Sequence, residues 1–152
     1  GGITATTFWN PYPTFMDTNN LSLVVFIKYS NFKILFPGDL EKAGWRALLQ
    51  RPDFCAELRG TDVLVASHHG RESGYCADIF NYFTPSVVVI SDKPIEHETQ
   101  QTVPDYRRIV RRQGVRVSTT MKDRHVLTTR RDGWIQFNVA NDSYTITTEY
   151  MG

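Results

Sequence analysis

The sequence predicts a mixed α/β fold, because short apolar runs typical of buried strands alternate with amphipathic stretches typical of helices. Two runs, within 62–67 and 86–91, are almost entirely aliphatic, as expected for strands that are covered on both faces. A further observation is that 32–36 and 62–67 are each followed directly by a short polar motif containing glycine. Together these features indicate a sheet with chemically active groups at the ends of neighbouring strands.

The first part of the chain is expected to begin irregularly and to continue with a hairpin and a helix. Residues 1–20 are rich in Thr, Asn and Pro, and Trp9-Asn10-Pro11-Tyr12-Pro13 excludes regular helix, so we expect an extended or looped segment. Residues 22–29 and 32–36 are rich in Val, Ile and Phe and are separated by two residues, which predicts a β-hairpin. Residues 41–50 have apolar side chains at helical spacing and predict an amphipathic helix.

The remainder repeats the alternation and ends in strands. The expected elements are a strand at 62–67, a helix at 75–83, a strand at 86–91, a helix at 104–113 and a strand at 115–119. The tail alternates like antiparallel strands at 125–129, 134–139 and 144–150, with Arg131-Asp132-Gly133 and Asn141-Asp142 as turns. Because no linker or repeat divides the chain, residues 1–152 predict a single domain.

Composition is that of an ordinary globular domain, with 41% hydrophobic and 22% charged residues. No apolar run approaches the length of about 18 residues that a membrane span needs, and no signal-peptide pattern is present, so we expect a cytoplasmic location. Cys55 and Cys76 lack metal-binding spacing and predict reduced thiols. Residues 1–100 contain 8 Lys and Arg against 11 Asp and Glu, whereas residues 101–152 contain 9 against 5, so the C-terminal part is basic.

Two motifs at strand ends suggest a metal site. Gly38-Asp39 follows the strand at 32–36, and His68-His69-Gly70 follows the strand at 62–67. Side chains at the carboxyl ends of buried strands are held rigidly and project into the crevice above the sheet. Carboxylate and imidazole groups presented in this way suit Zn or Mn.

In this order, Asn19-Asn20-Leu21-Ser22, Phe36-Pro37-Gly38-Asp39 and Ser67-His68-His69-Gly70 resemble the C-terminal half of a metallo-β-lactamase-fold hydrolase. The ComEC-like branch is the most similar, and the resemblance extends over roughly residues 18–137. It implies an αββα fold in which metal ions lie between two sheets. It also implies two metal ions, Zn or Mn, per complete site, with Asp39 bridging them and His69 binding one; His68 is the weaker candidate.

The family's H-x-H-x-D-H motif, which supplies most of the ligands, does not occur in this sequence, whose histidines are His68, His69, His97 and His125. A catalytic zinc site takes three protein ligands and a water, so Asp39 and His69 alone would bind metal weakly. We therefore expect either the C-terminal part of a longer enzyme, completed by an N-terminal half or another polypeptide, or a degenerate domain that kept only the fold.

Each candidate ligand also has a plainer interpretation. Asp39 could cap the helix at 41–50, because aspartate is favoured at such positions. His69 could simply hydrogen-bond within its loop, and His68 could orient a ligand instead of being one.

Several residues are candidates for contact with an anionic substrate. Arg71 and Ser73 follow the histidine motif, and an arginine fork matches phosphate geometry, although a surface ion pair is an equal alternative for Arg71. Arg107 and Arg111, with Arg108 and Arg112, are expected on one face of the helix at 104–113, as a stripe for phosphate contacts or as a solvated face. His97 is a candidate proton donor, or a solvated loop residue.

The leading hypothesis is a metal-dependent hydrolase of phosphodiester or nucleic-acid substrates, in which Asp39, His69 and His97 are catalytic. The alternative is a non-catalytic scaffold that binds nucleic acid or protein through its basic face. If the chain is only the C-terminal half of such a fold, the apolar surface that the first half covers would be exposed, including the segment of Trp9 and Tyr12. This predicts self-association or a bound N-terminal half.

Overall fold

The computed structural model describes residues 2–93, 101–140 and 143–151. Within these ranges the helices are α1 (Lys42–Leu48), α2 (Pro52–Leu58), α3 (Val103–Ile109) and α4 (Thr129–Asp132). The strands are β1 (Ile3–Phe8), β2 (Val24–Tyr29), β3 (Phe32–Phe36), β4 (Val63–Val65), β5 (Val87–Ile90), β6 (Val115–Val117), β7 (Lys122–Arg124), β8 (Val126–Thr128), β9 (Ile135–Ala140) and β10 (Ser143–Thr148).

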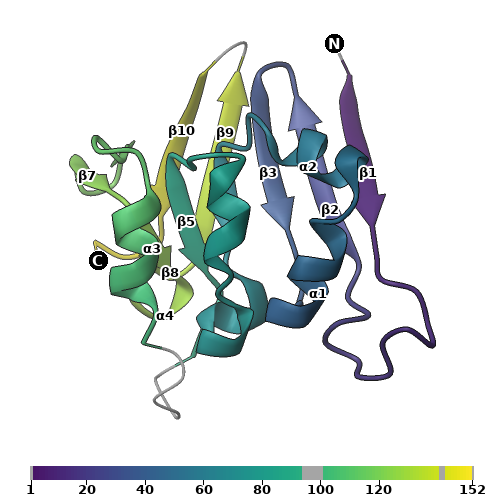
Figure 1. Ribbon diagram of the computed structural model, residues 1–152. Coiled ribbons are helices and arrows are strands. Elements are labelled where there is room, and N and C mark those ends of the chain that lie inside the picture. The colour runs from purple at the N-terminus through teal and green to yellow at the C-terminus, as the bar shows by residue number, and fades with distance from the viewer. Residues whose placement is uncertain (1, 94–100, 141–142, 152) are drawn as a thin grey trace.

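These strands form a six-stranded sheet, in the order β1-β2-β3-β4-β5-β8, and a four-stranded sheet, in the order β7-β6-β10-β9. In the six-stranded sheet β1, β2 and β3 are antiparallel, whereas β3, β4, β5 and β8 are parallel. Helices α1, α2 and α3 lie in front of the strands in Figure 1. The mixed α/β class predicted from the sequence is confirmed, as a sandwich of helices and two mixed sheets.

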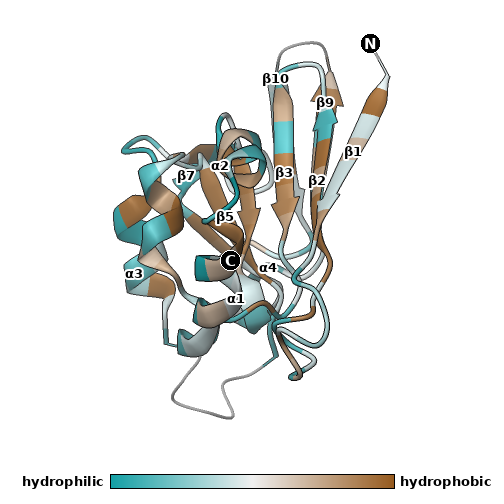
Figure 2. Ribbon diagram, turned by 45° about the vertical axis from the view of Figure 1, so that its right-hand side comes forward, coloured by the Kyte–Doolittle hydropathy of each residue, from teal (hydrophilic) through white to brown (hydrophobic). Residues whose placement is uncertain are grey.

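Local patterns located the elements of the first part well. The hairpin of β2 and β3 is present, and Ser30 adopts a positive φ of 51° in its turn. The helix expected at 41–50 is α1, and the aliphatic run at 86–91 is β5, whose four residues are all buried. Figure 2 shows β5 as hydrophobic along its length. Within the segment expected to be irregular, β1 pairs antiparallel with β2, and its first five residues are exposed.

The second part departs from the predictions at several points. The helix expected at 75–83 is wrong: only a 3-10 segment at Ala77–Asn81 forms, because Cys76 is extended. The helix expected at 104–113 ends at Ile109, since Val110 is extended. The strand expected at 125–129 is β8, which pairs parallel with β5, and Arg131-Asp132-Gly133 closes helix α4 instead of forming a hairpin turn. Residues 141–142, the other expected turn, lie outside the described residues. Helix α2 and strand β7 were not predicted.

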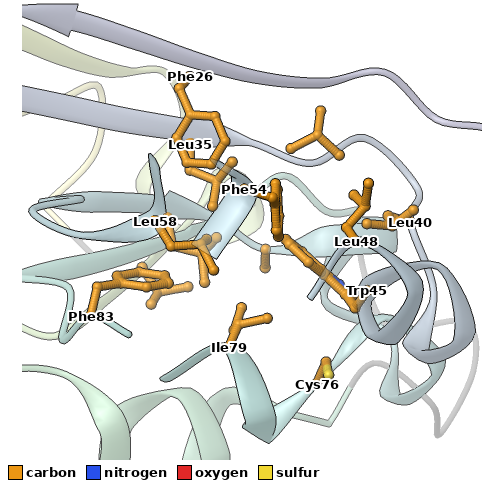
Figure 3. Packing of buried hydrophobic residues seen from close by; sticks show 14 of the residues in the cluster. Phe26, Leu35, Leu40, Trp45, Leu48, Phe54, Leu58, Cys76, Ile79 and Phe83 are labelled. Atoms are coloured by element: carbon orange, nitrogen blue, oxygen red, sulfur yellow. The ribbon is translucent and has the colours of Figure 1, made fainter. Parts of the chain in front are cut away.

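Two hydrophobic clusters hold the layers together. The first lies between the helices and the six-stranded sheet, where the Phe54 ring packs edge-on against Phe8 and Phe26 and is 6.2 Å from the Trp45 ring. Figure 3 shows Phe54 between Phe26 and Trp45. The second joins the two sheets through residues such as Val87 and Ile146. Burial on both faces of the central strands fixes their carboxyl ends, where the candidate site lies.

No helix among the described residues is long and apolar enough to cross a bilayer. Cys55 and Cys76 are free thiols, as expected, and burial raises the pKa of the Cys76 thiol.

Candidate metal centre

The loops after three neighbouring parallel strands meet at one edge of the six-stranded sheet. Asp39 follows β3, His69 follows β4, and Ser91 follows β5. The His68 amide donates to the Gly38 carbonyl, which ties the first two loops together, and the His69 ring contacts the Ser91 carbonyl of the third. Convergence at the carboxyl ends of parallel strands is the arrangement expected of a ligand site in an α/β sheet.

Asp39 is positioned by its glycine neighbour and by the segment before β2. Gly38 has a φ of +63°, a backbone conformation that residues other than glycine rarely adopt. A Cβ atom at this position would lie 3.1 Å from the Ser22 side chain. The Ser22 hydroxyl accepts a hydrogen bond of 3.1 Å from the Asp39 amide. The Asp39 side chain is 46% exposed, so its carboxylate remains open to solvent and to a ligand.

His69 has one ring nitrogen fixed and the other directed at Asp39. Its Nδ1 lies 2.7 Å from the Ser91 carbonyl oxygen, so this nitrogen carries the proton and donates it. In the neutral ring Nε2 then has the free lone pair, and it lies 3.6 Å from the Asp39 Oδ1. A backbone carbonyl that fixes the tautomer in this way is characteristic of histidine ligands to metals.

The separation between Asp39 and His69 fits a shared metal ion better than a direct hydrogen bond. At 3.6 Å the contact is longer than the hydrogen bonds of about 2.7–3.2 Å that nitrogen and oxygen form. Two ligand atoms each about 2.1 Å from one tetrahedral zinc ion are about 3.4 Å apart. The two side chains are also similarly exposed, at 46% and 53%, so an ion could reach both.

His68, although adjacent in sequence, has both ring nitrogens engaged with protein groups. Nδ1 lies 3.1 Å from the Ser73 hydroxyl and 3.1 Å from the Glu41 carboxylate. Nε2 lies 3.2 Å from the Arg71 guanidinium and accepts from it. Its side chain is only 11% exposed. His68 has no nitrogen left for a metal, so the structure places it in the role of a supporting residue.

The Asn19-Asn20-Leu21-Ser22 motif is structural in this chain. The buried Asn20 side chain accepts hydrogen bonds from the amides of Glu41 and Gly44, 3.2 and 2.8 Å long, and so caps the start of α1. Asn19 donates to Glu41, the same carboxylate that contacts His68. The motif therefore holds together the loop of Asp39 and the loop of the two histidines.

Among the residues that the structure describes, no group of three or more His, Cys, Asp or Glu side chains could hold a metal ion. Asp39 and His69 therefore have no third ligand within these residues. The next carboxylate along the sheet edge is that of Asp92, whose side chain is 2% exposed and lies 3.6 Å from Arg130. Burial raises the pKa of the Asp92 carboxyl, and Arg130 opposes that shift. His97 lies outside the described residues.

The candidate substrate contacts are dispersed. Arg71 and Ser73 make their contacts with His68, which accounts for both without a substrate. Arg111 is not on α3, contrary to expectation; it donates to the Thr84 carbonyl and lies 3.8 Å from Asp62. Because Asp62 precedes β4 and His69 follows it, Arg111 belongs to the opposite edge of the sheet. Arg107, on α3, lines a cleft with residues of β7 and α4.

Several residues that shape this region were not predicted. Ser91 orients His69, Glu41 and Asn20 support the loops, and Thr129 exchanges two hydrogen bonds with the backbone of Asp92. Their roles depend on contacts between segments 20 to 40 residues apart, which spacing in the sequence does not reveal. Asn20 alone carried a signal, because it belongs to a motif already noted.

Comparison of the chain with protein-family models, with curated proteins and with solved structures gives no match. The resemblance to metallo-β-lactamase-fold hydrolases therefore rests on the three sequence motifs alone.

Proposed function

We propose that this chain carries part of the metal centre of a hydrolase of the metallo-β-lactamase type that acts on phosphodiesters. The observation that carries the proposal is the contact between the Asp39 Oδ1 and the His69 Nε2, 3.6 Å apart, half exposed and aligned by the Ser91 carbonyl. Both groups end neighbouring strands, where a rigid sheet holds them in place.

The residues present fit part of such a centre. Asp39 and His69 would each give one ligand, and the second carboxylate oxygen of Asp39 could reach a neighbouring ion. Metal ions bound there would supply Lewis-acid stabilisation of a phosphoryl oxygen and a hydroxide nucleophile at neutral pH. Since catalytic centres use more ligands than these two, the rest would come from residues outside those that the structure describes or from another polypeptide.

The other residues have supporting tasks in this proposal. Ser22 and Gly38 fix the direction of Asp39, and Ser91 holds the His69 ring with its lone pair toward the centre. Glu41 and His68 hold the two loops at a constant separation. This division assigns metal binding to Asp39 and His69 and structural support to the residues that contact them or their loops.

Metal uptake by the chain tests the proposal. The protein is dialysed against Zn or Mn, and bound metal is measured for the parent and for Asp39→Asn and His69→Ala. Matched controls are Asp78→Asn, which removes an aspartate of similar exposure, 55%, and His125→Ala. We expect uptake by the parent and both controls, and its loss in the two site variants.

Equal uptake by Asp39→Asn and the parent would contradict the assignment. So would no uptake by the parent even at metal concentrations high enough to detect weak binding by two ligands. In that case the non-catalytic binding domain would be the better hypothesis. In a protein that carries the remaining ligands, Asp39→Asn should also abolish hydrolysis of a phosphodiester while leaving the fold intact.

A further inference from the structure

A second feature beside the candidate metal centre is a basic cleft between α3 and the segment from β7 to α4. It consists of two adjoining cavities of about 330 and 250 Å³, which share Val103, Arg124, Val126 and Arg131. Arg130 lines one cavity and Arg107 the other, so four arginines surround the cleft. We name this feature the arginine cleft. A lining that combines apolar side chains, such as Val103 and Val126, with four arginines suits an organic anion.

Two of the four arginines are fixed by buried carboxylates. Arg124 lies 3.1 Å from Asp132, whose side chain is fully buried, and Arg130 lies 3.6 Å from Asp92, whose side chain is 2% exposed. Both arginine side chains are about one-fifth exposed. These pairs hold the cations in set positions at the wall of the cleft, so little side-chain entropy remains to be lost when an anion binds.

The other two arginines supply the uncompensated charge. Across residues 2–93, 101–140 and 143–151, neither Arg107 nor Arg131 has an ion pair, and Asp123, which also lines the cleft, lies 3.6 Å from Arg116. Among the residues that the structure describes, the carboxylates Asp92, Asp123 and Asp132 near the cleft are thus matched by Arg130, Arg116 and Arg124. Two positive charges remain to attract a phosphate.

The cleft is linked to the candidate metal centre by a short chain of contacts. His69 contacts the Ser91 carbonyl, the next residue Asp92 exchanges hydrogen bonds of 2.8 and 2.9 Å with the Thr129 hydroxyl, and Arg130 and Arg131 follow in α4. A ligand bound at Asp39 and His69 would therefore have the arginine cleft beside it along the sheet edge.

We propose that the arginine cleft binds backbone phosphates of a nucleic-acid strand whose scissile phosphodiester lies at Asp39 and His69. This inference rests on the proposed function for the position of the scissile group. The phosphate-binding role of Arg107 and Arg131 has its own support in the cleft, and a contact to the backbone carries no base preference.

Fluorescence anisotropy of a single-stranded DNA of about 12 nucleotides, within the usual site sizes for such proteins, tests the cleft without any metal. Arg107→Gln and Arg131→Gln each remove one free charge, and Arg59→Gln removes an exposed charge after α2 as the matched control. We expect each cleft variant to weaken binding about 3- to 10-fold and to reduce the salt dependence by about one phosphate contact.

Equal binding by the cleft variants and the parent, or an equal loss in Arg59→Gln, would overturn the proposal. If a mononucleotide bound as tightly as the oligonucleotide, the proposal that the cleft binds a nucleic-acid strand would be wrong, and a small anion would be the better ligand. Measuring metal uptake on the same samples separates the two proposals: if uptake fails while Arg107 and Arg131 still govern DNA binding, only the hydrolase assignment is lost.

Discussion

His68 and His69 adjoin in the chain, have the same chemistry and both adopt left-handed backbone conformations, with φ of 49° and 55°, yet their rings lie in different surroundings. The His68 side chain is only 11% exposed and contacts Glu41, Arg71 and Ser73. The His69 ring is half exposed, and its Nε2 is directed at Asp39 beyond hydrogen-bond distance. The paired left-handed conformations turn the two side chains toward different segments.

The comparison separates support from ligation. A histidine with both nitrogens satisfied contributes hydrogen bonds to folding but has no lone pair to give to a metal. A histidine with one nitrogen fixed by a carbonyl and the other free contributes less to folding and is prepared for a ligand. Stability and metal affinity should therefore respond oppositely to substitutions at the two positions.

The largest expected effect is on metal binding. His69→Ala should lower the affinity for Zn at least about 100-fold, because it removes one of the two ligands, whereas His68→Ala should lower it less than about 10-fold through loosening of the loops. Isothermal titration with Zn measures both. Equal losses in the two variants would contradict the division of roles.

The next largest effect is on stability, with the order reversed. His68→Ala should reduce the free energy of unfolding by about 2 kcal/mol, because it leaves partly buried groups of Arg71 and Glu41 without their contacts. His69→Ala should change it by less than about 0.5 kcal/mol, as expected for an exposed side chain. Urea denaturation of both variants without metal gives the comparison, and a larger loss in His69→Ala would refute it.

Asn20 extends the contrast to the neighbouring motif. Asn20→Ala should cost about 1–2 kcal/mol, since it removes the acceptor for the Glu41 and Gly44 amides at the start of α1. Asn19→Ala, which loses one bond of 3.3 Å to Glu41, should cost about 0.5 kcal/mol or less. Denaturation midpoints of the two variants test this; similar values would show that the cap is not what makes Asn20 important.

The smallest expected effect concerns the direction of Asp39. Ser22→Ala removes the acceptor for the Asp39 amide and should cost about 0.5–1 kcal/mol. It should weaken Zn binding a few-fold, because the carboxylate becomes less fixed. Ser73→Ala, which removes a contact of His68 instead, serves as the control and should leave Zn affinity within twofold of the parent, a bound of about 0.4 kcal/mol. An equal effect of the two on Zn affinity would count against the role of Ser22.

Local sequence signals predicted the parts of this fold that local chemistry decides. The aliphatic run of β5, the hairpin of β2 and β3 and the apolar spacing of α1 need no distant partner to be recognised. The position of Asp39 and His69 at neighbouring strand ends followed from the same signals, because parallel strands bring their carboxyl ends together.

What the sequence left undecided depends on distant contacts. The alternation of apolar and polar residues at 125–129 indicates a strand but does not identify its partner. In the structure this strand, β8, pairs with β5 and is therefore parallel, not antiparallel as predicted. Whether Arg107 and Arg111 share a helix face depends on the length of α3. Because Val110 is extended, α3 ends before Arg111. Nothing in the two adjacent histidines distinguishes them until Glu41 and Ser91, from other loops, are in place.

Nitrogen-15 NMR of the histidine rings during titration with Zn distinguishes the two histidines within one sample. We expect the Nε2 signal of His69 to shift on adding Zn, both nitrogens of His68 to stay unchanged, and Asp39→Asn to remove the His69 response. A response at His68, or a His69 response that survives Asp39→Asn, would contradict the assignment of Asp39 and His69 as the metal-binding pair.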